Sequence, residues 1–151
     1  MPNHCYQEVK IAGPTDIVRE LYHGLVSNGY MNGKCKNPSF CSLVIPIPIE
    51  TYVEESDGLF PPWYNFCVKH WDTKWDVCEV VIVDDWETQG NLAEFSFKCW
   101  TAWAPPVPIW NRLNELGVLV EAVYEDEGGS FTGEYRDGEH TEWESQHESV
   151  S

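Results

Sequence analysis

The stretch Val77–Trp100, VCEVVIVDDWETQGNLAEFSFKCW, decides the fold. Residues 77–84 form a nearly unbroken aliphatic run, which predicts a strand. From residue 93 to 99 the odd positions are apolar and the even positions between them are polar, which predicts a second strand with one buried side. Residues 85–91 contain Gly and Asn and predict a turn. Together these features predict a β-hairpin.

The segments before and after this hairpin each contain a predicted helix and at least one predicted strand. Before it, residues 5–11 alternate as a strand does, and apolar residues at helical spacing follow from about Thr15 to Ser27, where Asn28-Gly29 ends the helix. After it come a helix at 109–116, ended by Gly117, and strands at 118–124 and 131–136. The order β–α–β–β–α–β predicts an α+β, ferredoxin-like split β-α-β sandwich: an antiparallel sheet with two helices on one face.

Residues 29–76 interrupt this order, and we treat them as an insertion. We predict a loop at 29–41, an extended edge segment at 42–49 because Pro46 and Pro48 lack backbone N–H groups, and a short helix at 63–71. Residues 1–136 would then be a single domain. Residues 137–151 are polar and acidic, and we predict a flexible tail there.

The composition limits what the chain can bind. The 151 residues carry 25 acidic and 9 basic side chains, a net charge of −16, so a basic surface for DNA or RNA is not available. No apolar run reaches the length of a membrane span, and residues 1–10 do not resemble a signal peptide. We therefore expect the six cysteines to be reduced thiols in a cytoplasmic protein.

Patterns that would indicate chemistry are weak. His4, Cys5, Cys35 and Cys41 supply zinc-ligand types, but the chain has no Cys-x-x-Cys pair, so we predict no metal site and no cofactor. Gly128-Gly129 is followed by no predicted helix, and this favours a turn over a phosphate-binding loop. We expect that the chain is not an enzyme.

The acidic residues are unevenly distributed. Three segments, 50–57, 72–94 and 121–151, hold 21 of the 25 acidic residues. Carboxylates on strand ends and loops are commonly only solvated. The same carboxylates could instead imitate the phosphates of a nucleic acid and bind a basic protein surface. Both interpretations remain open from the sequence.

Several short blocks carry a resemblance. They are NHCY at 3–6, LVIPIP at 43–48, HWDTKWD at 70–76, TAWAPP at 101–106 and YEDEGGSFTGE at 124–134. With these blocks, from residue 3 to about 139, the chain resembles the YubB ferredoxin-like family, small proteins of phages and conjugative plasmids. The family pattern usually has Gly at position 72 and Met-Gly-Phe-x-Gly at 129–133. The resemblance implies the fold and a mobile-element origin, and it supplies no established activity or catalytic residue.

Charge and resemblance together lead to our first hypothesis. The chain would be a counter-defence protein of anti-CRISPR or anti-restriction type, a DNA mimic in the bacterial host cytoplasm. It would bind a basic, nucleic-acid-handling host defence protein, without itself binding nucleic acid or membrane, as a monomer or small homo-oligomer. The residues assigned to partner binding are Asp84, Asp85, Trp86, Glu87, Glu121, Glu125, Asp126, Glu127, Glu134, Asp137, Glu139, Glu142, Trp143 and Glu144.

Two alternatives compete with this hypothesis. In the first, the loop Trp71–Asp76 binds a small nucleotide-like ligand or carries out a reaction, with Lys74 between Asp72 and Asp76 as the anchor. In the second, the chain is a structural or interaction module of a phage, and its acidity serves only solubility.

Overall fold

One six-stranded antiparallel sheet organises the chain, in the order β4-β5-β1-β6-β7-β8. The structure, a computed structural model, describes residues 4–48, 62–73, 75–129, 131–136 and 138–144. The sheet strands are β1 (His4–Pro14), β4 (Cys78–Gln89), β5 (Leu92–Ala102), β6 (Leu119–Asp126), β7 (Phe131–Arg136) and β8 (Glu139–Glu144). The fold is therefore mixed α+β with an antiparallel sheet, and this part of the prediction is confirmed.

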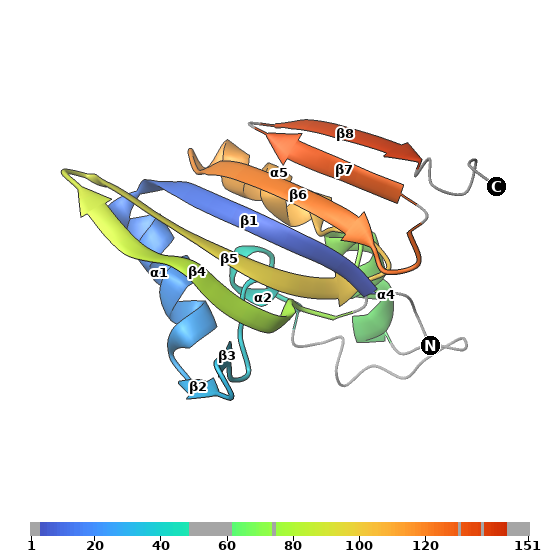
Figure 1. The fold of residues 1–151 in the computed structure, drawn as a ribbon, viewed down its shortest axis with the longest axis horizontal. Coiled ribbons are helices and arrows are strands. Elements are labelled where there is room, and N and C mark those ends of the chain that lie inside the picture. Colours follow the sequence, from blue (N-terminus) through green and yellow to red (C-terminus); the bar gives the residue numbers. More distant parts are fainter. Residues whose placement is uncertain (1–3, 49–61, 74, 130, 137, 145–151) are drawn as a thin grey trace.

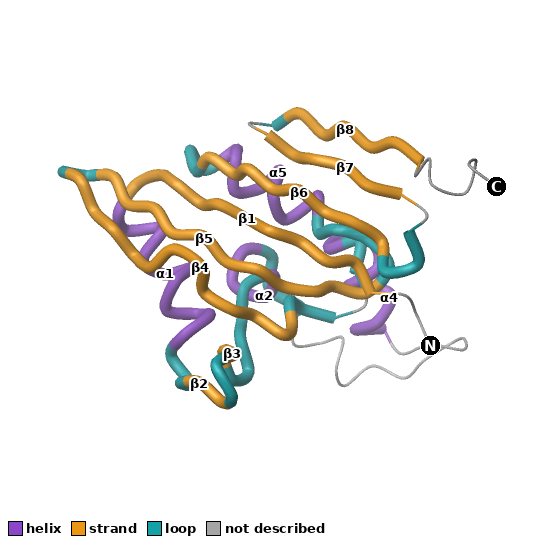
Figure 2. The backbone as a smooth tube through the Cα atoms, in the orientation of Figure 1, coloured by secondary structure: helices purple, strands orange, loops and turns teal. Residues whose placement is uncertain are grey.

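The helices cover one side of this sheet. They are α1 (Thr15–Val26), α2 (Cys41–Val44), α4 (Pro62–Trp71) and α5 (Val107–Glu115). Figure 1 shows them behind the sheet, and Figure 2 separates the orange strand layer from the purple helices. The core lies between the two layers, where Leu21 and Trp110 of the helices join Ile11, Phe95 and Phe97 of the strands. None of the helices in the described ranges is long and apolar enough to cross a membrane.

The predicted hairpin exists, but its turn lies later than expected. β4 continues to Gln89, and Gly90, with φ +64°, makes the turn, whereas the sequence predicts a turn over the whole of 85–91. The pairing of β4 with β5 shifts register three times, between Cys78 and Val81, Ile82 and Asp84, and Asp84 and Glu87. Such bulges twist an edge strand and hinder its pairing with another chain.

Two predictions within residues 29–49 are wrong in part. The loop at 29–41 contains a small hairpin of β2 (Tyr30–Met31) and β3 (Lys34–Cys35), which turns at Gly33. The predicted extended segment at 42–49 begins with α2 instead. The cause is remote in sequence: the Asp76 carboxylate accepts backbone N–H groups at the start of this helix, from Cys41 at 2.8 Å and Ser42 at 3.1 Å.

The prediction of a flexible tail from residue 137 is also wrong for part of its length. Glu139–Glu144 forms β8, which pairs antiparallel with β7 from Phe131↔Glu144 to Arg136↔Glu139. The exposed edge of β7 supplies the hydrogen-bonding partners that order this polar segment. Residues 145–151 lie outside the described residues.

Candidate functional site

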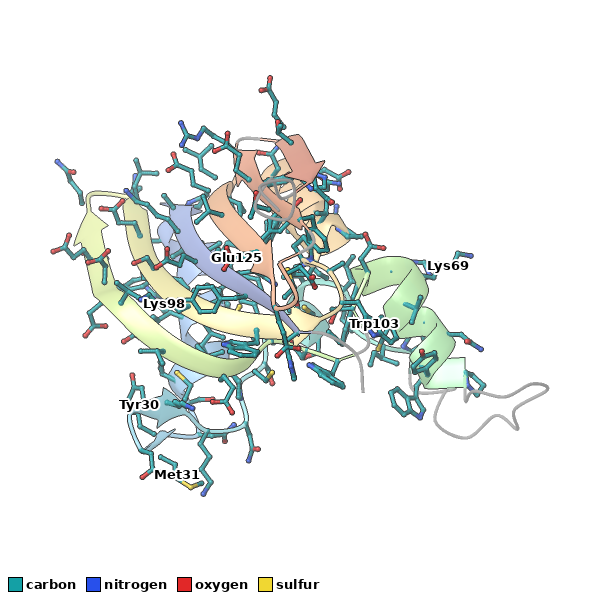
Figure 3. All side chains as sticks on the ribbon, turned by 45° about the vertical axis from the view of Figure 1, so that its right-hand side comes forward. Tyr30, Met31, Lys69, Lys98, Trp103 and Glu125 are labelled. Atoms are coloured by element: carbon teal, nitrogen blue, oxygen red, sulfur yellow. The ribbon has the colours of Figure 1, made fainter. Side chains whose placement is uncertain are left out.

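The side of the sheet that faces away from the helices is the candidate site, and we call it the open face. Alternate residues of each strand point to it: on β6, Glu121, Val123 and Glu125 are exposed, whereas the residues between them are buried. In Figure 3, the labelled residues Lys98 and Glu125 belong to two strands of this face, β5 and β6. The open face is the side that an antiparallel sheet commonly turns to water.

Strand register fixes which residues are neighbours on the open face. One row across it runs Lys98, Glu8, Val123, Glu134, and the next contains Ser96, Lys10, Glu121, Arg136. Two ion pairs cross the strands, Lys98–Glu8 at 3.5 Å and Lys10–Glu94 at 3.6 Å. All four partners are about half exposed, so these pairs contribute little to stability.

Carboxylates outnumber cations on the open face. The basic residues in register there are Lys10, Lys98 and Arg136, whereas the acidic residues are Glu8, Asp84, Glu87, Glu94, Glu121, Glu125, Glu134 and Glu139. Glu125 lies between Tyr6 and Thr132, and Glu134 between Val123 and Thr141, so neither has a cation directly across from it. The uncompensated carboxylates give the face a negative potential.

The open face is also hollowed. One hollow, of about 280 Å³, is lined by residues of β4, β5, β1, β6 and β7, including Asp84, Glu121 and Glu134. A second, of about 400 Å³, lies over Val123 and Thr132 with Tyr6 at its side. β4 and β7, which three strands separate in the sheet, both border the first hollow, so the sheet curls into a trough.

The structure brings six of the predicted partner-binding residues together on this face. These are Asp84, Glu87, Glu121, Glu125, Glu134 and Glu139. Asp84 is held by Ser96, whose hydroxyl donates to Asp84 Oδ2 at 2.8 Å. Asp137 and the side chains of Trp143 and Glu144 lie outside the described residues.

Asp85 and Trp86, two of the predicted partner-binding residues, point away from the open face and toward α1. Across from them β5 has only Phe95 between the partners of Asp84 and Glu87, so a bulge carries both residues toward α1. Tyr22 donates its hydroxyl to Asp85, and its ring lies 5.9 Å from that of Trp86. The hydrogen bond from Tyr22, followed by the backbone N–H of Trp86, lowers the pKa of Asp85. Trp86 is thus a partly buried packing residue.

Three further predicted residues lie away from the open face, two of them at the end of β6 and one within β8. Asp126 is buried, and Glu127 accepts the backbone N–H of His4 at 2.8 Å, which ties β1 to the end of β6. Glu142 pairs in register with Gly133, on the helix side of the sheet. Burial, and then the charge of Glu142, raise the pKa of Tyr124 there.

The alternative ligand loop has a structural role. Asp76 Oδ1 and Oδ2 accept N–H groups from Phe40, Cys41, Ser42 and Val77, the last at 2.7 Å, and the Ser42 hydroxyl donates as well. These bonds use the carboxylate that the ligand hypothesis needs. Lys74 lies outside the described residues, and Asp72 is exposed.

The same loop meets another of the sequence blocks named above. The Thr73 hydroxyl accepts the backbone N–H of Ala102 at 2.8 Å, and Trp71 Nε1 donates to the carbonyl of Ile45 at 2.9 Å. The buried Gln7 side chain donates to Thr101 beside them. Segments 43–48, 70–76 and 101–106 thus hold one another in place through hydrogen bonds.

The described residues contain neither a cluster suited to a metal ion nor an exposed, reactive thiol. No group of three His, Cys, Asp or Glu side chains suited to a metal ion occurs among the described residues. All six cysteines are free, and five are buried. Burial raises the pKa of Cys5 to about 12 and that of Cys67 to about 11, so these thiols are protonated near neutral pH.

Comparison with protein-family models, with curated proteins and with solved structures gave no match. The candidate site therefore rests on the geometry of the chain itself. Sequence reasoning missed two of its residues, Glu8 and Glu94. Glu8 stands outside the acidic segments, and Glu94 ends the segment 72–94 but is not among the residues assigned to partner binding. The alternation in residues 5–11 and 92–100 was the signal that could have placed both on one face with Glu121 and Glu125.

Proposed function

We propose that the chain binds a basic surface of another protein through the open face. The observation that carries this proposal is that, among the described residues, eight carboxylates and three cations share one hollowed side of the sheet that no described helix covers. A partner rich in Lys and Arg gains Coulomb attraction along the whole trough, and the attraction also steers its approach. Nucleic acid and a second copy of this chain, with its net charge of −16, would both be repelled.

The kind of partner follows from the resemblance. We assign the chain to the ferredoxin-like proteins of phages and plasmids, an assignment that the order β4-β5-β1-β6 supports, since it is the strand order of a split β-α-β sandwich. On this assignment β7 and β8 extend the sheet beyond the four-stranded pattern. A small acidic protein of a mobile element has a use for binding the groove in which a host nuclease holds DNA or guide RNA. The proposed function is counter-defence of the anti-CRISPR or anti-restriction type, in the bacterial cytoplasm.

A competition experiment tests the proposal. A panel of purified restriction and RNA-guided nucleases is bound to fluorescently labelled DNA or guide RNA, and the full chain is added in about 50 mM salt. Release of the nucleic acid from at least one nuclease, lost as salt approaches about 0.5 M, is expected because screening shortens the range of the attraction.

The control separates the open face from general acidity. Glu125→Gln/Glu134→Gln removes two charges from the open face, and Glu20→Gln/Glu115→Gln removes two exposed charges from the helix side. We expect about tenfold weaker competition for the first variant only, a change of about 1.4 kcal/mol. Equal effects of both variants, or no release from any nuclease at low salt, would rule the proposal out.

A further inference from the structure

The open face contains aliphatic side chains that its charge does not explain. Val83, Leu92, Leu119 and Val123 are 52%, 61%, 51% and 48% exposed. Leu119 and Val123 occupy two of the four outward positions on β6. An antiparallel sheet that faces only water usually carries polar residues at such positions.

Val123 has a particular setting. Glu8 lies directly across from it on β1 and Glu134 directly across on β7. Glu121 and Glu125 precede and follow it by two residues on its own strand, and therefore share its face. A half-exposed aliphatic side chain is thus surrounded by carboxylates at all four adjacent positions of the open face.

The shape of the trough limits what can lie there. Its lining extends from β4 to β7, four strand intervals apart, which is about 19 Å along a flat sheet at 4.8 Å per interval. An α-helix with its side chains is about 10 Å wide and fits such a trough. Val123 lines this trough, and Leu119 lines a separate hollow with Leu92 and Glu94. The two residues are about 13 Å apart along β6, a distance spanned by about nine helical residues.

We infer that the open face binds a basic amphipathic helix of the partner protein, an inference that rests on the proposed function and names the element recognised. Apolar side chains of the helix cover Leu119 and Val123, and Lys or Arg side chains beside them reach the surrounding carboxylates. Charge complementarity selects this occupant. A strand added at the edge of β4 is hindered by its three register shifts, and a second copy of the chain would bring like charges together.

Two synthetic peptides of about 18 residues test the inference. Both contain the same Leu, Lys and Ala residues, arranged in one to place Leu on a single helical stripe and scrambled in the other. Their binding to the full chain is followed by fluorescence anisotropy in about 50 mM salt. The striped peptide is expected to bind at least about tenfold more tightly, since only it can cover aliphatic and acidic positions together.

Matched variants locate the effect. Leu119→Ser/Val123→Ser is expected to reduce the affinity for the striped peptide to that for the scrambled one, whereas Leu43→Ser/Val68→Ser, which alters exposed aliphatic residues of α2 and α4, leaves both affinities unchanged. Should the strand variant fold poorly, the wild-type chain still gives an answer by backbone-amide NMR. Shifts on binding must fall on β1, β6 and β7, and shifts confined to the helices would overturn the inference.

The outcomes separate the inference from the function beneath it. Equal binding of both peptides, weakened by Glu125→Gln/Glu134→Gln but not by Leu119→Ser/Val123→Ser, would overturn the helix and leave an acidic surface that binds by charge. Absence of binding by either peptide at low salt would overturn both, provided that the nuclease competition is also negative. Competition with a nuclease but no peptide binding would overturn the helix alone.

Discussion

At the scale of single residues, Asp76 connects parts of the chain that sequence analysis treats separately. Its carboxylate accepts N–H groups from residues 40–42, about 35 positions earlier, and from Val77, so it caps α2 and orients the start of β4. A cap supplied by a distant residue leaves no local signal at the helix that it stabilises. This is why Cys41–Val44 was predicted as extended.

The role of Asp76 predicts a stability effect. Asp76→Asn keeps the shape of the side chain but removes the charge and one acceptor, and its NH₂ group would face backbone donors. We expect a loss of about 1.5–3 kcal/mol in the free energy of unfolding, measured by urea denaturation at pH 7. Asp72→Asn, in the same loop at an exposed position with φ +62°, should change it by less than about 0.5 kcal/mol. Equal losses would contradict a capping role.

At the scale of secondary structure, β8 depends on how a ring packs beneath the sheet. Tyr124 of β6 lies over Gly133 of β7, and its hydroxyl hydrogen-bonds His140 of β8. A Cβ at position 133 would lie 2.5 Å from Tyr124 Cζ and 2.7 Å from the carbonyl oxygen of Thr141. Glycine at this position therefore lets three strands share one aromatic side chain.

The packing of Tyr124 predicts a local loss of order. Gly133→Ala should force the Tyr124 ring or β8 to move, at a cost of about 1–3 kcal/mol, because backbone of β8 borders the site. Hydrogen exchange should then show faster exchange of the β8 amides while β1 and β5 keep their protection. Tyr124→Phe, which keeps the ring and loses only the hydroxyl, should have a smaller effect. Unchanged β8 protection in Gly133→Ala would show that the strand does not depend on this contact.

Elements with a regular pattern were predictable, and those that depend on a partner were not. In β1, β5 and α1, the spacing of the apolar residues shows which side of the element is buried. The sequence alone therefore predicts these three elements. β8 shows no run of alternating apolar residues, and it pairs along the free edge of β7. The bulge at Asp85-Trp86 likewise leaves no recognisable pattern in the sequence. It determines which acidic residues of β4 reach the open face.

At the scale of the whole molecule, the sequence predicts the net charge but not where the carboxylates gather on the folded surface. The net charge of −16 is a property of composition, whereas the meeting of Glu8, Glu121, Glu125 and Glu134 on one face requires three strands in register. Glu8 was missed because it lies outside the acidic segments of the sequence. A surface built across strands is therefore found only when the alternation of each strand is combined with the order of the strands.

A surface kept for binding should lower the stability of the free chain, and this gives the last prediction. Glu125 and Glu134 lie diagonally across β6 and β7, where side chains are about 7–8 Å apart, well within the Debye length of about 30 Å in 10 mM salt. Glu125→Gln/Glu134→Gln should therefore raise the Tm by about 2–5 °C in about 10 mM NaCl and by less in about 150 mM, where the Debye length is about 8 Å. Glu20→Gln/Glu115→Gln, measured alongside by circular dichroism, should have little effect, because its two sites lie on different helices and Glu115 is paired with Arg112 at 3.1 Å. A rise in Tm for the open-face variant alone would mean that the chain keeps mutually repelling charges there at a cost in stability, as expected of a functional site. If both variants respond alike to salt, the acidity acts evenly over the molecule and serves its solubility.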